Sequence, residues 1–400
     1  MSFRTSSQKL QFWPIFILAF IFAFSSPLLS LAIPIYFIRQ GIQIKFISLL
    51  SIAMTITYSI SPIILTNYSN RLGRRRSVII SMVGATCLQL IFYITLNPII
   101  FLIERLLEGF ILGFFFPNLT ASISDVPNIN HPRYLAKFNL SWSIAIVFGL
   151  LFGAIILMFT EDLKFIFYIS PIILLINSII AITCFQPSIN SYYNTQSMNP
   201  LDRTANENYN SIKNYYIPVI VPLLFILYTS FAAANGSFLY PIRAEFLGFS
   251  ASSTYIANIF AVITQTIALY FSNLLILNKL KLVSVLTLII YPFLFIFFLF
   301  NKIYSLFIVL FMFSGFFYGI LYGTASKLFI TLNVLKKTSK YSGILEGSTG
   351  LSFFISQIFL GFMADINILL GYLSLSLSLI TLFFINLIFI RKFKEVEVKT

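Results

Sequence analysis

The chain has 400 residues, of which 58% are hydrophobic and only 10% are charged, whereas a soluble globular chain carries about 25% charged residues. So few polar side chains cannot cover a water-soluble particle of this size, and the hydrophobic residues come in blocks of the length that crosses a bilayer as a helix, about 20 residues. The composition excludes a soluble domain and predicts an all-α polytopic membrane protein.

Twelve hydrophobic blocks follow one another along the chain. They lie at about 12–38, 46–67, 77–96, 98–123, 139–160 and 165–185, and then at about 217–240, 252–276, 282–300, 304–328, 341–364 and 368–390. The stretch between the two sets is rich in Asn, Ser and Tyr and has no hydrophobic periodicity, which is typical of a connector. We therefore expect an N-terminal six-helix bundle over 1–185, a linker over 186–216, and a C-terminal six-helix bundle with a short tail over 217–400.

The distribution of positive charge predicts the orientation. With the N-terminus inside, twenty of the 26 Lys and Arg residues fall on the inner side and five on the outer side, Arg243 among the five, while Arg105 alone lies within a span. Cytoplasmic loops carry the excess of Lys and Arg. The net charge of +14 is thus explained by topology and not by nucleic acid, and we expect both termini and the linker to be cytoplasmic in a plasma-membrane protein.

The two halves share a glycine pattern. The span 98–123 contains "GFILGFFFP" from Gly109, and the span 304–328 contains "GFFYGILYG" from Gly315, so that the small or helix-breaking residues match at an offset of 206. "IPIY" (33–36) and "YPIR" (240–243) match at an offset of 207. Repeats of half the chain length are common in transporters. The pattern predicts two pseudo-symmetric bundles.

Four arginines follow the second span, in "TNYSNRLGRRR" (66–76). This loop is similar to the G-x-x-x-D-R-x-G-R-R motif of the major facilitator superfamily, and matches it at Arg71, Gly73, Arg74 and Arg75. Thr66 replaces the first glycine, and Asn70 replaces the acid. "RLLEG" (105–109) and "GFMAD" (361–365) resemble further features of this superfamily, and the resemblance covers almost the whole chain. The motifs of its drug–proton antiporter and sugar-porter subfamilies are absent from the sequence.

The resemblance implies a role for the arginine loop. In the superfamily the loop helps to latch the two halves on the cytoplasmic side, and its arginines pair with an acid at the inner end of the fourth span, where this chain has Asp125. Gly73 permits the tight turn, and Asn70 keeps hydrogen bonding without the charge. The alternative is that the arginines only anchor the topology.

Three ionisable residues interrupt the span 98–123. Glu104, Arg105 and Glu108 stand on one side of a helix by their spacing. Ionisable groups within a span are energetically unfavourable, so a functional role is the first hypothesis where they occur. Two carboxylates sharing one guanidinium leave one carboxylate less well compensated, so that it can take up and release a proton. The alternative is a structural ion pair. Glu346, early in the span 341–364, is a further coupling candidate, with a helix-start carboxylate as its alternative.

Neutral polar residues on four other spans are candidates for a substrate cavity. The superfamily's architecture places these spans around a central cavity, although each residue can equally join helices by hydrogen bonds. They are Asn139, Trp142, Asn235, Asn258, Gln265 and Gln357. Pro27, Pro34 and Asn235-Gly236 are candidate bending points.

These patterns favour a secondary active transporter of a small molecule, working by alternating access and coupled to protons. A facilitator on the same fold and a non-transporting membrane sensor are the alternatives. The sequence has one histidine, no metal-ligand cluster and no nucleotide-binding loop of the form G-x-x-x-x-G-K-[ST], so we predict no metal, no cofactor and no enzymatic activity. The expected partners are a small molecule, protons and the lipid bilayer, and the expected state is a monomer.

Overall fold

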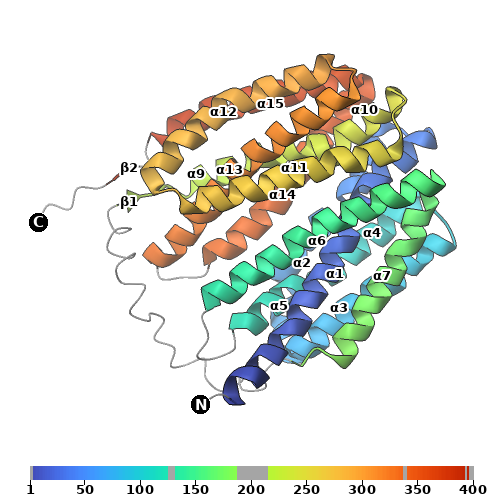
Figure 1. The fold of residues 1–400 in the computed structure, drawn as a ribbon, viewed down its shortest axis with the longest axis vertical. Coiled ribbons are helices and arrows are strands. Elements are labelled where there is room, and N and C mark those ends of the chain that lie inside the picture. Colours follow the sequence, from blue (N-terminus) through green and yellow to red (C-terminus); the bar gives the residue numbers. More distant parts are fainter. Residues whose placement is uncertain (1–2, 125–130, 187–214, 337–339, 392–393, 396–400) are drawn as a thin grey trace, which may run out of the picture. The chain divides into compact units, whose positions relative to one another are not determined.

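The computed structural model describes residues 3–124, 131–186, 215–336, 340–391 and 394–395. Almost all of these residues are helical (Figure 1). The strands in this part of the chain are two residues long each, β1 (Tyr215–Tyr216) and β2 (Lys394–Glu395), and they pair antiparallel. The predicted all-α membrane fold is confirmed. The linker predicted at 186–216 lies almost wholly outside the described residues.

The chain forms two compact units. The first comprises residues 1–42, 49–198 and 250–256, and the second comprises 43–48, 199–249 and 257–400. The first half of the chain supplies α1 (Phe3–Arg39), α2 (Ile44–Leu72), α3 (Arg74–Gln89), a 3₁₀ turn (Leu90–Tyr93), α4 (Pro98–Leu112), α5 (Phe115–Ser124), α6 (His131–Thr160) and α7 (Lys164–Thr183). The beginnings of α2 and α11 each cluster with the unit formed mainly by the other half.

The second half of the chain supplies the remaining helices. They are α9 (Ile220–Ala234), a π-helix (Asn235–Leu239), α10 (Tyr240–Phe246), α11 (Ala251–Leu274), α12 (Leu277–Phe300), α13 (Tyr304–Lys336), α14 (Lys340–Ile366) and α15 (Ile368–Ile390). Within this unit α9 packs against α13, α14 and α15, and α12 packs against α13 and α15. Eleven helical segments in the described part of the chain are long and apolar enough to cross a membrane.

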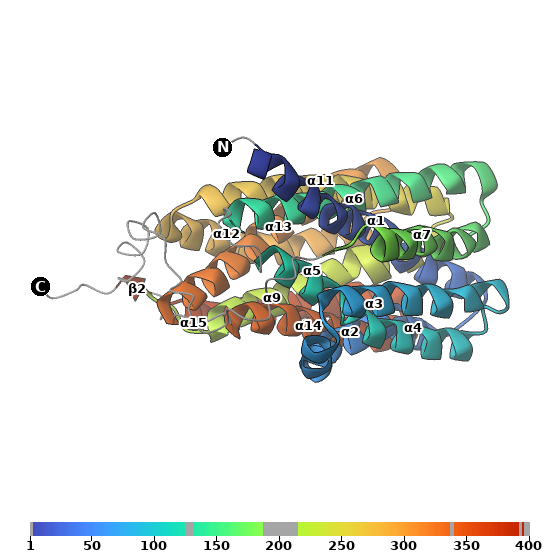
Figure 2. The same ribbon diagram turned by 90° about the horizontal axis from the view of Figure 1, so that it is seen from below.

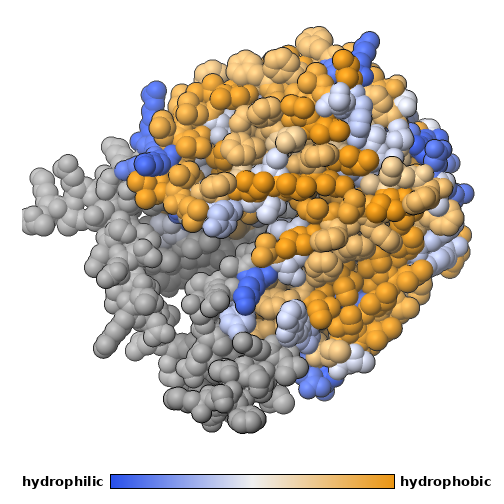
Figure 3. Space-filling view, viewed as in Figure 1, coloured by the Kyte–Doolittle hydropathy of each residue, from blue (hydrophilic) through white to orange (hydrophobic). Residues whose placement is uncertain are grey.

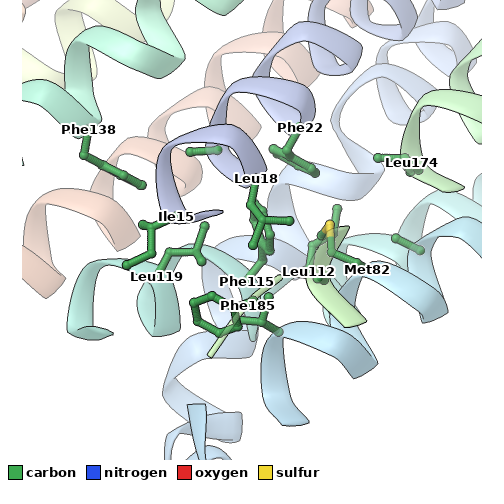
Figure 4. Packing of buried hydrophobic residues seen from close by; sticks show 14 of the residues in the cluster. Ile15, Leu18, Phe22, Met82, Leu112, Phe115, Leu119, Phe138, Leu174 and Phe185 are labelled. Atoms are coloured by element: carbon green, nitrogen blue, oxygen red, sulfur yellow. The ribbon is translucent and has the colours of Figure 1, made fainter. Parts of the chain in front are cut away.

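The core of the first unit is built by α1, which packs against α6 and α7 while α3 packs against α7 (Figure 2). Buried side chains of α1, α3, α4, α5, α6 and α7 form this core, and Figure 4 shows Leu18, Phe22, Met82 and Phe115 close to one another. Leu18 and Phe115 are fully buried. Because lipid tails are as apolar as leucine, close packing and not the expulsion of water holds such helices together.

The molecular surface is hydrophobic to an extent that only a bilayer accommodates. Phe159 is 86% exposed and Phe300 is 76% exposed, and Figure 3 shows hydrophobic side chains covering most of the face in view. Soluble proteins rarely expose continuous apolar patches above a few hundred Å². The helices therefore have lipid as their solvent.

One predicted span is two helices in the structure. The block expected at 98–123 divides into α4 and α5, with a turn at Gly113 and Phe114. Pro117 has no N–H to donate to the carbonyl four residues earlier, which is that of Gly113, and its ring crowds that carbonyl. Pro117 then lies in the first turn of α5, where a missing N–H is tolerated. With α4 and α5 counted as one span, the helices agree with the twelve expected.

The helical hydrogen-bond pattern differs between the predicted bending points. α1 runs as one helix through Pro27 and Pro34. At Asn235 the α-helical pattern changes to a π-helix, in which the N–H of Tyr240 donates to the carbonyl of Asn235, five residues earlier. Pro241 follows and cannot donate the normal helical hydrogen bond. The wider turn accommodates this missing donor, and π-helical turns often lie at functional sites.

Candidate functional site

A cluster of charges is buried on α4. Asn97 caps the N-terminus of this helix, since its side chain accepts hydrogen bonds from the N–H groups of two residues in the first turn. From there the helical spacing carries Glu104, Arg105 and Glu108 to one buried side. Glu104 and Glu108 are each 1% exposed, and Arg105 is 6% exposed. The burial of all three groups excludes a solvated surface ion pair.

Glu108 is fully engaged by its neighbours. One oxygen forms an ion pair with the Nη1 of Arg105, and the other accepts a hydrogen bond of 2.7 Å from the Nε2 of Gln89 on α3. The Oε1 of Gln89 in turn accepts a hydrogen bond of 2.8 Å from the hydroxyl of Ser170 on α7. This chain of contacts ties α4 to two further helices. Gln89 and Ser170 did not emerge as site residues from the sequence, although both are polar residues in hydrophobic spans.

Glu104 is in the opposite situation. No donor of the described residues bonds to either of its oxygens. Its closest charged neighbours are Arg105 and Glu108, and the carboxyl of Glu108 is near enough to share a proton with it. The guanidinium of Arg105 is turned toward Glu108 and toward the sulfur of Met54, which lies 2.9 Å from Nη2. The cluster thus holds two carboxylates and one guanidinium, and the guanidinium pairs with Glu108.

Two glycines bring α4 and its continuation against α2. A methyl group added at Gly109 would collide with the carbonyl oxygen of Met54 and with the hydroxyl of Thr57. One added at Gly113 would collide with the side chain of Ser61. The charged cluster is therefore held on a helix whose backbone approaches its neighbour as closely as glycine allows.

The second half repeats this contact. A methyl group added at Gly315 on α13 would collide with the carbonyl oxygen of Ala261 and with the hydroxyl of Thr264, both on α11. These two residues stand 207 positions after Met54 and Thr57. The sequence repeat therefore corresponds to the same packing contact in each unit.

In the structure a single residue separates the two helices that carry the arginines of this loop. α2 ends at Leu72 and α3 begins at Arg74, and between them Gly73 has φ +85°, a conformation that L side chains rarely adopt. The Nη1 of Arg74 donates to the side-chain oxygen of Asn118, 3.3 Å away. Arg75 donates to the carbonyl of Ile182 at the C-terminus of α7, 3.0 Å away, where a positive charge is favoured by the helix dipole.

Asn118, which sequence reasoning missed, joins the arginine loop to the break in the fourth span. Its oxygen also accepts a hydrogen bond of 2.7 Å from Ser69, and its nitrogen donates to the carbonyl of Phe114, 2.6 Å away. The signal available in the sequence was an asparagine directly after the helix-breaking Pro117. Asp125, the partner expected for the arginines, lies outside the described residues. Arg71 is exposed, and the side chain of Asn70 is not described.

Three of the predicted cavity residues gather around the π-helix. The amide of Asn258 on α11 donates to the carbonyl of Gly236, 3.3 Å away, and the amide of Gln357 on α14 donates to the hydroxyl of Ser237, 3.0 Å away. Both side-chain polar atoms of Asn235 and the Oε1 of Gln357 are buried without a hydrogen-bond partner in the described part of the chain.

The other predicted residues are placed as follows. Trp142 is half-buried and packs against the core of the first unit. Gln265 is half-buried on α11, and its backbone carbonyl lies against Gly319. The side chains of Asn139 and Glu346 lie outside the described residues.

Membrane-spanning helices in two units that repeat one packing contact, with ionisable groups buried in a span, define a polytopic membrane transporter fold. A model of the Major Facilitator Superfamily matches residues 15–333. The chain belongs to this superfamily.

The solved structures with similar folds include transporters. The crystal structure of the nucleoside transporter NupG is similar with a TM-score of 0.73 and 14% identity, over 96% of this chain and 100% of that one. The crystal structure of a bacterial homologue of the human lysosomal transporter Spinster has a TM-score of 0.71 and 10% identity, over 97% and 98%. At these identities the likeness shows the fold alone. No curated protein matches the sequence.

Proposed function

We propose that the protein is a proton-coupled secondary transporter, with Glu104 as the group that carries the proton. The observation behind this proposal is the buried Glu104 carboxyl, to which no donor of the described residues bonds, beside a second carboxylate already paired with Arg105. An isolated ionised carboxylate in an apolar interior is very unfavourable. Glu104 therefore holds a proton while the site is closed and releases it when water enters.

The two acids differ in their contacts, and we assign them different roles. Glu108 is held in place by its ion pair with Arg105 and by the hydrogen bond from Gln89. Glu104, one turn earlier, is the carboxyl whose protonation changes when water reaches the site. Alternating access then moves the proton, because the site is hydrated from one side of the membrane at a time.

The substrate proposed for this transporter is a small neutral molecule that forms hydrogen bonds. The predicted cavity residues around the π-helix are amides, Asn235, Asn258 and Gln357, and two of them keep unpartnered polar atoms. Amides offer donors and acceptors without charge. Nucleosides belong to this chemical class and are included in the substrate panel below.

The topology proposed from the charge distribution has both termini and the linker at 186–216 in the cytoplasm, in a plasma-membrane protein that works as a monomer. The two six-helix bundles, 1–185 and 217–400, are the parts that rock. The arginine loop, fastened to Asn118 by Arg74, would latch them at the cytoplasmic side.

The test is proton flux in proteoliposomes loaded with a pH-sensitive dye, measured while a panel of neutral substrates is added. Glu104→Gln is compared with wild type and with Glu161→Gln, a matched control that removes a carboxylate from an exposed position. We expect Glu104→Gln to lose substrate-driven proton flux and uphill uptake but to keep substrate exchange across the membrane, whereas Glu161→Gln behaves as wild type.

Two results would refute parts of the proposal. Proton flux that persists in Glu104→Gln removes this residue from the coupling role. Substrate uptake by the wild type without any proton movement leaves a facilitator, in which Arg105 and Glu108 are a structural ion pair.

A further inference from the structure

The second unit also contains a buried arginine. Arg243, in the last turn of α10, is 4% exposed, although its position after the seventh span placed it with the outer loop charges in the sequence. Its Nη2 donates to the carbonyls of Leu299 and Asn301, at 2.6 and 2.9 Å. These carbonyls belong to the end of α12, where the helix leaves acceptors unused.

The charge of Arg243 has no acidic counterpart in the described part of the chain. Arg105, the other buried arginine, is paired with Glu108, whereas the described residues provide no carboxylate in an ion pair with Arg243. Two carbonyl dipoles offset only part of a full positive charge. A buried, unpaired ion is very unfavourable in an apolar medium, so the arrangement calls for a negative partner.

Two aromatic rings lie against the guanidinium. Its carbon lies 4.9 Å from the ring centroid of Tyr372 on α15 and 5.9 Å from that of Phe307 on α13. Tyr240, one turn before Arg243 on α10, packs its ring against the same Phe307 at 5.0 Å. Both tyrosines are fully buried, and they are near enough to interact electrostatically with each other. α10, α13 and α15 thus bring Arg243, Tyr240, Phe307 and Tyr372 into one buried cluster, which we call the aromatic box.

Three hydrogen-bond donors in this box lack a partner among the described residues. They are the Nη1 of Arg243 and the hydroxyls of Tyr240 and Tyr372. A buried donor left unsatisfied destabilises a protein by about 1–3 kcal/mol. Each of these groups can donate to an anion, and the guanidinium supplies one positive charge.

We propose that the box formed by Tyr240, Arg243 and Tyr372 binds a small monovalent anion of the chloride class. One negative charge balances the one guanidinium, and an acceptor without donors of its own satisfies all three groups. The complete burial of both tyrosines favours a single-atom ion over a carboxylate or phosphate. This site lies within the second unit and does not depend on the proton-coupling role of Glu104.

The experiment is thermal unfolding of the purified protein in detergent, titrated with sodium chloride against sodium gluconate at constant ionic strength. For wild type we expect a saturable rise of about 2 °C or more in the melting temperature with chloride, since a ligand that binds only the folded state stabilises it. Arg243→Gln should lose the rise. Lys302→Gln, which removes one positive charge from an exposed loop position, should keep it.

A second variant guards against misfolding of Arg243→Gln. Tyr372→Phe keeps the ring over the guanidinium and removes one donor, so the midpoint of the chloride titration should move to higher concentration while the maximal rise remains. Crystals of the wild type soaked in bromide should give an anomalous peak in the box. Equal melting temperatures in chloride and gluconate, or an unchanged midpoint in Tyr372→Phe, would overturn the proposal and leave Arg243 as a cap of α12.

Discussion

Replacing Arg105 by Met and replacing Glu104 by Gln should affect stability very differently, although the two residues are adjacent on α4. Methionine keeps an unbranched apolar side chain but removes the guanidinium, so Glu108 remains buried with only the amide of Gln89 as a partner. Removing one partner of a buried ion pair costs about 3–5 kcal/mol, because the other charge stays in the interior.

Glu104→Gln takes no acceptor from a donor of the described residues, because no donor bonds to either oxygen of Glu104, and the glutamine amide can donate to Glu108 as a protonated carboxyl would. Glutamine has nearly the same shape as a protonated glutamic acid and, like it, carries no charge. The free energy of unfolding should therefore stay within about 1 kcal/mol of wild type. The two variants should differ by about 3–5 kcal/mol.

The assay is reversible unfolding in mixed micelles with increasing sodium dodecyl sulfate, followed by circular dichroism, for the wild type and both variants in parallel. A loss of stability in Glu104→Gln as large as that in Arg105→Met would refute the reasoning. It would mean that Glu104 is ionised and shares the guanidinium with Glu108.

Three further predictions concern packing and the loops, and each is checked by the same unfolding assay. Gly315→Ala should destabilise by about 1–3 kcal/mol because its methyl group meets the α11 backbone, whereas Gly347→Ala, with open space at its Cβ, should be neutral or stabilising by up to about 1 kcal/mol; similar losses in both would contradict the close contact. Asn118→Leu should destabilise by about 1–3 kcal/mol, because its buried amide joins two helices and the arginine loop; no change would show that these hydrogen bonds are unimportant. The Lys45–Asp365 pair, 3.7 Å apart with both side chains partly exposed, should contribute no more than about 1 kcal/mol and lose that in high salt, so a large, salt-independent effect would be inconsistent with it.

The helices could be predicted because lipid imposes a simple requirement on the sequence. Every backbone polar group must be satisfied within a span, so a span appears as an uninterrupted apolar run of sufficient length. The interruptions depend on a single residue and are harder to foresee. Pro117 divides the fourth span at Gly113, whereas α1 continues through Pro27 and Pro34. The sequence alone does not distinguish these prolines.

The charged cluster was predictable in its members but not in its pairing. Spacing on one helix brings Glu104, Arg105 and Glu108 to one side. It does not determine which of the two acids pairs with Arg105. Gln89, which approaches from α3, engages Glu108, and that contact depends on tertiary packing. The burial of Arg243 could not be predicted for the same reason, since it depends on the helices that pack around the end of α10.

The repeat separates what the fold requires from what the function requires. Gly109 and Gly315 make the same contact in both units, so close packing of these helices is needed twice and was retained in both copies. The charges were not retained. An offset of 206 carries the three ionisable positions of α4 onto buried side chains of α13 that cannot ionise at neutral pH. Those positions are Leu310, Phe311 and Ser314. A role in folding alone would be expected in both copies, as the glycines are, whereas proton coupling needs a single site. The restriction of the charges to one half is therefore a reason, independent of burial, to seek the chemistry of transport at Glu104.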